Sequence, residues 1–459
     1  MHRYHNNAPR IIFAAPQTKL FLLAAICYFF LILIDNSFRL NVSPFLTLLG
    51  YIFLIPLGAV MLVSFFFACA IVIFGMTDKK IRHKVRLGLY YHGNGNPLGL
   101  KDGEYLPKIE VKEYKNEIFV LKIYCGVVPA EKLEKMSSVI SSALNKKEAK
   151  YAVTLVDTDV ACNYVSFQIE DVTIDRSYTF QSVQEMIPTS VTEFQVQKGD
   201  FIDLTTSGSM LVAGKTRSGK TTGVISILLQ ALLCGQDTYD SSIIIIDPKR
   251  AELSMLPHTV TVDEDGEARE ILETMKAFET TIKRRQKYLN FKCLETGDVW
   301  HWWDLGMHPS FLFIDEYVAC RSLFPKKAEK SSDYCIATFD NTLKRIVTMG
   351  ASAGCYVIIS IAEASVEEGG LPTMLKSAMT TKILFKPTLN EGRLIWDSSK
   401  LENFPERVYS VGDCWFSSTD DEHDNVTYCH FPHLDFPVFQ ELGNLLKKYY
   451  GESDDGGAP

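Results

Sequence analysis

The sequence predicts an α/β protein whose large C-terminal domain has a central, mostly parallel β-sheet. Three features indicate this fold. Mostly apolar runs recur at Met210–Ala213, Ser242–Ile246 and Phe311–Ile314, and such runs are typical of parallel strands covered on both faces. A glycine-rich turn and a helical stretch follow the first run, and acidic residues follow the other two. Because α/β sheets bind ligands beyond the carboxyl ends of their strands, we expect the functional site at these turns.

We expect four segments along the 459 residues. A transmembrane hairpin with cytoplasmic flanks occupies residues 1–86, and a small α+β domain for adaptor or oligomerisation contacts occupies residues 87–190. The large α/β domain occupies residues 191–450, and residues 451–459 form a disordered tail.

Two stretches near the N-terminus contain no charged residue, Leu20–Ile34 and Phe45–Phe74. The first is slightly short for a bilayer core of about 30 Å, and the second is long enough to cross it with some tilt. The alternative for the first stretch is a signal peptide, but no small-residue cleavage site follows it and a second apolar stretch does. Basic residues precede the first stretch and follow the second. The sequence therefore predicts a multi-pass protein of the cell membrane with both termini in the cytoplasm.

Charge is distributed unevenly along the chain. Residues 1–86 hold nine Lys/Arg and two Asp, a net charge of +7; because the whole chain carries −8, residues 87–459 carry −15. This balance excludes a protein that binds nucleic acid through overall positive charge, so any DNA contact requires a local basic surface such as the lumen of a ring. The eleven cysteines form no CxxC pair, as expected for reduced packing residues in a cytosolic domain.

The segment 87–190 shows alternating and helical patterns but no cluster of catalytic side chains. The expected elements are strands at Lys108–Tyr114, Glu117–Tyr124, Tyr151–Val156 and Tyr164–Ile169, with one helix at Ala130–Leu144.

The first apolar run of the large domain leads into Gly214–Thr221, which fits the pattern GxxxxGK[ST] and precedes a helical stretch at Val224–Cys234. In this strand–loop–helix context the motif is a P-loop, in which backbone N–H groups and the helix N-terminus hold phosphates. Lys220 is expected to reach the β- and γ-phosphates and Thr221 to ligate Mg²⁺, so the predicted ligands are ATP and Mg²⁺. The expected nucleotide-binding residues are Gly214, Lys215, Thr216, Arg217, Ser218, Gly219, Lys220, Thr221 and Thr222.

Two acidic turns compete for the role of the Mg²⁺-binding carboxylate. Asp315-Glu316 follows one apolar run and Asp247 follows another. We favour Asp315 for the metal and Glu316 as the base that activates water, because hydrolysis needs both groups. The alternative is that Asp315-Glu316 only caps the following helix.

Other patterns have two interpretations each. The amphipathic helix Gly266–Asn290 ends in basic residues that form a solvated face or contact a subunit or phosphate. Trp300, Trp302 and Trp303 with His301 form a packing cluster or a base-stacking platform, and Asp420–Asp424 is a solvated turn or a cation site. The remaining expected elements are Tyr356–Ser360, Thr381–Phe385, a hairpin of Cys414–Phe416 with Val426–His430, and a closing helix at Phe436–Tyr450.

Over Val191–Tyr450 these residues resemble the FtsK/SpoIIIE family of DNA translocases. The resemblance implies a RecA-like P-loop motor that assembles into a ring, usually a hexamer, and pumps DNA with ATP. It also implies an arginine acting across subunits, Arg345 or Arg393, of which Arg393 keeps its motif position. The landmarks in family order are the P-loop, Asp247-Pro248-Lys249, Ala251-Glu252-Leu253, Arg284-Arg285, Asp315-Glu316, Gly350–Gly354, Glu391–Asp397 and Gly412-Asp413.

The expected layout resembles the coupling proteins of Gram-positive conjugative plasmids and integrative elements, which implies single- or double-stranded DNA and a relaxase as partners. Three alternatives remain. The first is a chromosome-segregation translocase, although its DNA-reading domain is not expected after Tyr450. The second is an ATP-binding DNA or relaxase receptor with little hydrolysis, and the third is a protein-secretion motor, which usually has tandem motor domains.

Three positions depart from the family pattern. Ala362 stands where a glutamine usually follows the sensor strand, Ala351 stands where an arginine is usual, and Arg217 replaces a common glycine. The first two departures bear on the rate of hydrolysis and on coupling between subunits. Nucleotide binding rests on Lys220, Thr221 and Asp315.

Overall fold

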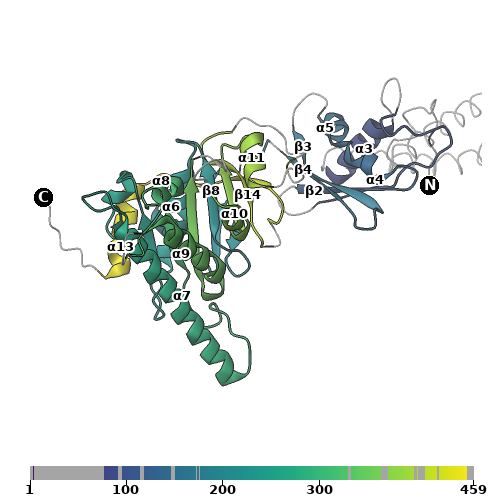
Figure 1. Ribbon diagram of the computed structural model, residues 1–459. Coiled ribbons are helices and arrows are strands. Elements are labelled where there is room, and N and C mark those ends of the chain that lie inside the picture. Colours follow the sequence, from purple (N-terminus) through teal and green to yellow (C-terminus); the bar gives the residue numbers. More distant parts are fainter. Residues whose placement is uncertain are drawn as a thin grey trace, which may run out of the picture. The chain divides into compact units, whose positions relative to one another are not determined.

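The computed structural model describes part of the chain, and these residues form two compact units (Figure 1). The first unit extends to Ile174, and the second follows it. The described residues are 4, 77–90, 96–113, 118–145, 150–171, 173–174, 176–328, 332–362, 371–396, 401, 409–420 and 423–451.

The predicted membrane spans at residues 20–34 and 45–74, and the predicted tail from residue 452 onward, lie outside the described residues. Among the helices that are described, none is both long and apolar enough to cross a bilayer.

The first unit contains a four-stranded antiparallel sheet in the order β1-β2-β4-β3. Alternate residues of the central strand β2, including Phe119, Leu121 and Ile123, are buried, as the alternating sequence predicted. Helix α3 packs on α5 so closely that a Cβ on Gly88 would lie 2.3 Å from that of Ala143. The elements are α3 (Thr77–Tyr90), β1 (Ile109–Glu113), β2 (Ile118–Tyr124), α4 (Ala130–Glu134), α5 (Ser137–Leu144), β3 (Tyr151–Thr158) and β4 (Tyr164–Asp171).

The helix expected over residues 130–144 is divided into α4 and α5. Lys135 and Met136 leave helical geometry between them, and the hydroxyl of Ser137 donates to the carbonyl of Glu134 at 3.3 Å. A serine side chain that bonds to nearby backbone competes with the helical ladder. The apolar stripe is retained, since Leu133 and Ile140 remain buried.

Within the described residues, the second unit is built on an eight-stranded sheet. Six neighbouring strands pair in parallel, and the last two add an antiparallel edge. The mixed α/β fold predicted from the sequence is therefore confirmed. The strands in spatial order are β10 (Thr259–Val260), β9 (Ile243–Ile246), β11 (Ser310–Ile314), β12 (Cys355–Ile361), β8 (Met210–Gly214), β13 (Thr381–Phe385), β14 (Asp413–Ser417) and β15 (Thr427–His430).

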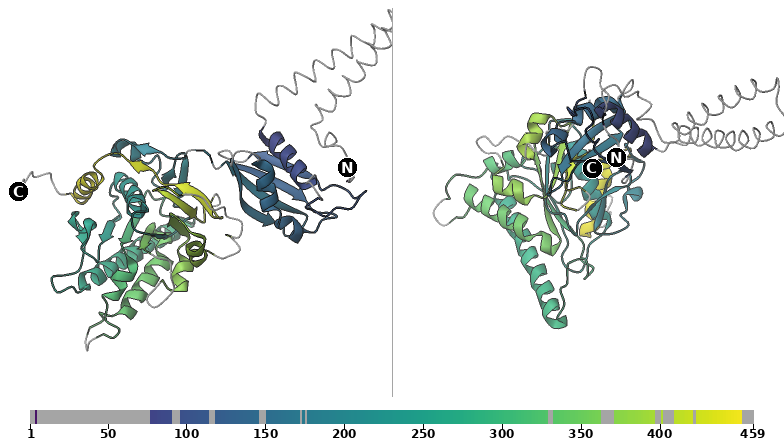
Figure 2. Two further views of the ribbon diagram at one scale, coloured as in Figure 1. Left: turned by 90° about the horizontal axis from the view of Figure 1, so that it is seen from above. Right: turned by 90° about the vertical axis from the view of Figure 1, so that its right-hand side faces the viewer.

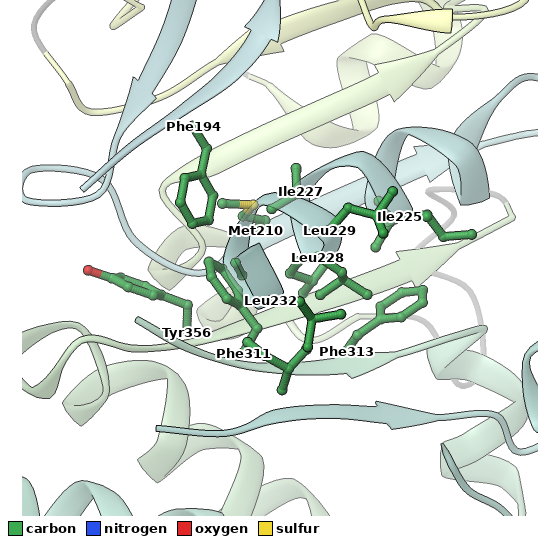
Figure 3. Close-up of a cluster of buried hydrophobic side chains, with 14 of the residues drawn as sticks. Phe194, Met210, Ile225, Ile227, Leu228, Leu229, Leu232, Phe311, Phe313 and Tyr356 are labelled. Carbon is green, nitrogen blue, oxygen red and sulfur yellow. The ribbon is translucent and has the colours of Figure 1, made fainter. Parts of the chain in front are cut away.

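Helices lie on both faces of this sheet (Figure 2). Helices α6 and α13 pack together on one face, and α7 and α9 pack together on the other. In Figure 3, Ile227, Leu228 and Leu232 of α6 pack against Phe311 and Phe313 of β11. The helices of this unit are α6 (Lys220–Leu233), α7 (Arg269–Thr296), α8 (Tyr317–Ser322), α9 (Ile336–Met349), α10 (Thr373–Ala378), α11 (Leu389–Ile395) and α13 (Val438–Tyr450).

Residues 176–190, which the sequence analysis assigned to the small domain, pack with the second unit. Phe180, Val183 and Met186 are buried in its core. Strand β5 (Thr179–Phe180) also pairs in parallel with β16 (His433–Leu434), which follows the last strand of the large sheet. This partner lies about 250 residues along the chain, which a local pattern does not reveal.

Helix α7 begins and ends later than expected, at Arg269 and Thr296, and its C-terminal part extends away from the sheet (Figure 1). Gly297, with φ +78°, terminates it. The basic residues around Arg284 therefore lie within the helix, and the interpretation of a uniformly solvated face is wrong for Arg285, which is buried.

The packing interpretation of the tryptophan cluster is confirmed for one residue, and the base-stacking interpretation stays a prediction. Trp302 is fully buried in the core of the second unit and is a packing residue. Trp300, His301 and Trp303 line a cavity of about 760 Å³. Thr205 to Ser207 before β8 also line it, so the cavity lies at the amino ends of the strands, opposite the P-loop edge.

Candidate nucleotide-binding and hydrolysis site

The P-loop leaves β8 at Gly214 and enters α6 at Lys220. Gly214 has φ +149° and Gly219 has φ +99°, which are backbone conformations that favour glycine. Between them the N–H of Ser218 donates to the carbonyl of Lys215 at 3.2 Å. Lys220 is the first residue of α6 and Thr221 the second, so the sequence places both side chains at a helix N-terminus, where negative charge is favoured.

Two close approaches hold this loop in place. A Cβ on Gly214 would lie 2.9 Å from both the Cβ of Phe385 and the Oγ of Ser218, and a Cβ on Gly219 would lie 2.9 Å from the amide nitrogen of Gly412. The Ser218 hydroxyl is buried and has no hydrogen-bond partner among the described residues. Phosphate oxygens are acceptors that would satisfy this donor, so the loop fits the triphosphate expected from its sequence.

Arg217 adopts the left-handed conformation, with φ +64°. Glycine reaches this region without steric cost, whereas a residue with a Cβ is disfavoured there. The common glycine of the family pattern therefore has a conformational reason. Arg217 keeps the same backbone turn at some cost in strain.

Strand order brings Ser360 beside Asp315. Strand β12 lies between the P-loop strand β8 and β11, and Ile359 is the register partner of Ile314. The hydroxyl of Ser360 donates to Oδ1 of Asp315 at 2.9 Å. Burial raises the pKa of Asp315 above its usual value, although this hydrogen bond and the charge of Lys220 oppose the shift. A carboxylate that burial disfavours in its charged form gains from a nearby cation.

Glu316 points its side chain toward the P-loop. It lies at the N-cap of α8 with φ +50°, but its carboxylate makes no capping hydrogen bond. Instead, Oε1 lies 3.3 Å from Nζ of Lys220. Left-handed non-glycine residues are strained and concentrate at functional sites. The structure therefore contradicts the alternative in which Glu316 only caps the next helix.

Asp247, the other candidate for the Mg²⁺-binding carboxylate, is fully buried and forms hydrogen bonds within its own turn. Its carboxylate oxygens accept hydrogen bonds from the backbone N–H groups of Lys249 at 3.1 Å and Ser254 at 3.0 Å. With its oxygens engaged in this way, Asp247 is less suited to bind a metal than Asp315. The same turn places Lys249 with its Nζ 3.7 Å from Oε2 of Glu316.

The remaining predicted residues lie around this cluster or apart from it. Lys215 and Thr222 are exposed, and Nζ of Lys215 lies 3.6 Å from Oε1 of Glu391 on α11. Arg393 is exposed on the same helix. Arg345 lies on α9, where its guanidinium donates two hydrogen bonds to the carboxylate of Glu279, at 2.9 and 2.8 Å.

Sequence reasoning missed Ser360 and Lys249 as members of the site. Ser360 was noted only as the last residue of the expected strand Tyr356–Ser360, and Lys249 only as part of the Asp-Pro-Lys landmark. Ser360 lies near the end of β12 and Lys249 in the turn after β9, so the apolar runs place both at the carboxyl edge of the sheet but do not identify their partners.

Comparisons with known proteins agree with the sequence landmarks. Residues 175–300 match the sequence model of the FtsK/SpoIIIE family. The Ftsk domain-containing protein YdcQ of Bacillus subtilis is 29% identical over 156 residues, which cover 33% of this chain and 28% of that protein. The DNA translocase FtsK of Vibrio parahaemolyticus is 23% identical over 340 residues, covering 62% of this chain and 32% of that protein. The chain thus spans about a third of the length of these relatives.

Two solved structures are also similar. One is the pCW3 conjugation coupling protein TcpA in its monomer form with ATPγS, with 14% identity, a TM-score of 0.49, and coverage of 80% of this chain and 99% of that chain. The other is EssC (ATPases 2 and 3) from Geobacillus thermodenitrificans, with 16% identity, a TM-score of 0.43, and coverage of 61% and 53%. On the family match and the sequence relatives, the recognition made from the landmarks is confirmed, and this chain carries an FtsK/SpoIIIE-family domain.

Proposed function

We propose that this protein is a membrane-anchored, ATP-dependent DNA translocase that acts as the coupling protein of a conjugative element. One observation carries the enzymatic part of the proposal. Lys220 at the start of α6 lies beside the Asp315-Glu316 turn after β11, at the carboxyl edge of one sheet. The adjoining P-loop has a buried hydroxyl, that of Ser218, without a partner among the described residues.

Hydrolysis uses these residues in distinct roles. The P-loop amides and the Lys220 ammonium bind the triphosphate, and Thr221 and Asp315 would hold Mg²⁺, which neutralises phosphate charge when bound. The carboxylate of Glu316 accepts a proton from water as the water oxygen bonds to the γ-phosphorus. The bond from that phosphorus to the β–γ bridging oxygen breaks, and ADP leaves with the electron pair. Ser360 fixes the orientation of Asp315 through its hydrogen bond.

Arg393 is the better candidate for the arginine that acts across subunits of a ring, which we propose to be a hexamer. Arg345 is already bound to Glu279 through two hydrogen bonds. Arg393 is exposed, and within the described residues no ion pair engages its guanidinium. An exposed guanidinium is available to a neighbouring subunit's nucleotide.

DNA as substrate is supported by the family match and by the translocase relatives. The net charge of −15 over residues 87–459 means that DNA contacts are confined to local basic surfaces. Membrane anchoring, with both termini cytoplasmic, is supported by the uncharged stretches and their basic flanks. The role in conjugation, with a relaxase as partner, rests on the layout expected from the sequence.

A second candidate is an ATP-binding DNA or relaxase receptor that hydrolyses ATP very slowly. The observation that favours it is the apolar side chain of Ala362, directly after β12, which lies beside the P-loop strand. DNA-stimulated release of phosphate separates the two candidates, because only a translocase requires repeated hydrolysis.

The proposal predicts that Lys220→Ala abolishes DNA transfer and leaves membrane insertion intact. Loss of the ammonium should raise the Kd for MgATPγS by at least about tenfold, or about 1.4 kcal/mol. Binding is measured by titration of the purified full-length protein, and transfer by complementing a deletion in the element that encodes it. Lys344→Ala, at an exposed lysine on α9, is the control. Normal transfer by the Lys220→Ala protein would refute the proposal, and a chromosome-partition defect without a transfer defect would favour the segregation role.

A further inference from the structure

The carboxylate of Glu316 lies between two lysines from different elements. Nζ of Lys220, at the start of α6, is 3.3 Å from Oε1, and Nζ of Lys249, in the turn after β9, is 3.7 Å from Oε2. The proposed function uses Lys220 and Glu316 and leaves Lys249 without a role. Each lysine contacts a different carboxylate oxygen, so the two ammonium groups together restrict the rotation of the carboxylate.

Hydrogen bonds made by residues before and after Lys249 hold its turn in place. The buried carboxylate of Asp247 accepts hydrogen bonds from the N–H groups of Lys249 and Ser254. On the next residue, the guanidinium of Arg250 donates to the carbonyls of Val262 and Asp263, at 2.9 and 2.6 Å. The backbone of Lys249 therefore has a set position relative to the end of β9, although its side chain is half exposed.

Stability does not explain this ion pair. The side chain of Lys249 is 52% exposed and that of Glu316 is 23% exposed, and pairs near the surface contribute little to the free energy of folding. A fully buried aspartate nevertheless fixes the backbone of Lys249. This order is explained if the reaction requires the Lys249 ammonium to be near Glu316.

We propose that Lys249 is a positioning residue that holds the Glu316 carboxylate in the orientation needed to accept a proton from water. The inference rests on the proposed function, in which Glu316 is the base. When the Lys220 ammonium is engaged by phosphates, Lys249 is the cation, among those of the described residues, that stays paired with Glu316. It acts through Glu316 and does not touch nucleotide.

The test compares Lys249→Met with Lys249→Arg in the full-length protein, with ATP hydrolysis, ATPγS binding and thermal unfolding measured on each. Methionine should lower kcat about tenfold, a fraction of the 10² to 10⁴ that a positioned base contributes. For this variant KM and the Kd for ATPγS should not change, and the Lys249→Arg protein should retain most of the wild-type kcat.

The matched control is Lys283→Met, which removes a similarly exposed lysine paired with Glu279 on α7 and should leave kcat unchanged. The double variant Lys249→Met/Glu316→Gln should be no slower than Glu316→Gln alone, because both changes act on one group.

Four results would overturn the inference. The first two concern Lys249→Met: an unchanged kcat, or a rise in KM and Kd that shows direct nucleotide contact. The other two are a fall in melting temperature that accounts for the lost activity, and additive effects in the double variant. Failure of the proposed function looks different. If Glu316→Gln hydrolyses ATP as the wild type does, or the wild type does not hydrolyse it, the assignment of the base fails and the inference falls with it.

Discussion

Some buried charged residues of the second unit pair with groups that are far away in the sequence. His423 is an example, since its ring nitrogens contact the carboxylates of Asp420 at 2.9 Å and Asp200 at 3.0 Å. Asp200 begins β7 (Asp200–Asp203) and Asp420 follows β14. The imidazole therefore ties a small hairpin to the edge of the large sheet. The sequence analysis weighed a solvated turn against a cation site here. The solvated-turn interpretation is wrong for Asp420 and His423, which are buried, because a local pattern does not reveal that Asp200 lies nearby.

This pairing predicts a specific dependence of stability on pH. Burial alone would lower the pKa of His423, but the hydrogen bonds with Asp200 and Asp420 outweigh it and raise the pKa to about 10. The folded-state pKa thus exceeds the value of about 6.5 in an unfolded chain. The stabilisation by the charged imidazole is complete below about pH 6.5 and is lost as the pH rises through about 10.

His423→Gln should reduce the free energy of unfolding at pH 7 by about 3 kcal/mol, because it leaves the buried Asp420 carboxylate without its cation. The difference between wild type and variant should shrink between pH 7 and pH 10, as measured by urea denaturation. The control is His433→Gln, at an exposed histidine on β16. An equal effect of the two substitutions, or a difference that does not vary with pH, would show that the His423 pairing does not act in this way.

At the scale of the element, one buried arginine joins α7 to several other parts of the second unit. The Arg285 guanidinium donates to the Asp237 carboxylate at 2.6 Å and to three backbone carbonyls. Those carbonyls belong to Tyr239, Ala353 and His308. They lie just before β9, β12 and β11, so one side chain joins the helix to the segments that lead into three strands.

Arg285→Lys should destabilise the protein by about 3–5 kcal/mol, because a single ammonium cannot reproduce the guanidinium fork in a buried site. Arg284→Lys is a matched control on the adjacent residue, whose pair with Asp240 is about 60% exposed on both sides. It should change stability by less than about 1 kcal/mol. Denaturant midpoints of the two variants give the comparison, and similar midpoints would contradict the proposed anchoring role.

Local sequence patterns predicted the elements well where burial is continuous. Strands β8, β9, β11 and β13 coincide closely with the apolar runs expected to form them, since a strand buried on both faces has few polar residues. The P-loop and the Asp315-Glu316 turn were found for a similar reason: each follows such a run directly. The roles of Ser360, Lys249 and Arg285 were not predictable. They depend on the order of strands in the sheet and on loops far apart in the sequence, which no local pattern specifies.

At the scale of the whole molecule, the boundary between the two units lies earlier in the chain than the sequence suggested, at about residue 175. Residues 176–190 contribute Phe180, Val183 and Met186 to the core of the second unit, and β5 supplies a strand partner for β16. These residues lie before the P-loop strand, but they complete the face of the sheet that α6 covers. The functional site is therefore supported by a segment that the expected boundary at residue 190 would remove.

A fragment of residues 175–451 should fold, whereas a fragment of residues 191–451 should be much less stable. Burial of one large apolar side chain contributes about 1.5–3 kcal/mol, so loss of three removes on the order of 5 kcal/mol, comparable with the total stability of many domains. Thermal unfolding followed by circular dichroism gives the comparison. Equal melting temperatures for the two fragments would show that this segment does not belong to the core.

The close contact between the P-loop and the loop before β14 has a mechanical consequence. The N–H of Gly412 donates to the carbonyl of Ser218 at 3.1 Å, and neither Gly219 nor Gly412 has a side chain to separate the two backbones. A side chain on Gly219 would separate these two backbones, because its Cβ would lie 2.9 Å from the amide nitrogen of Gly412. A change in the conformation of residues 218–219 around phosphate would therefore also move the residues that lead into β14, at the opposite side of the P-loop strand from Asp315.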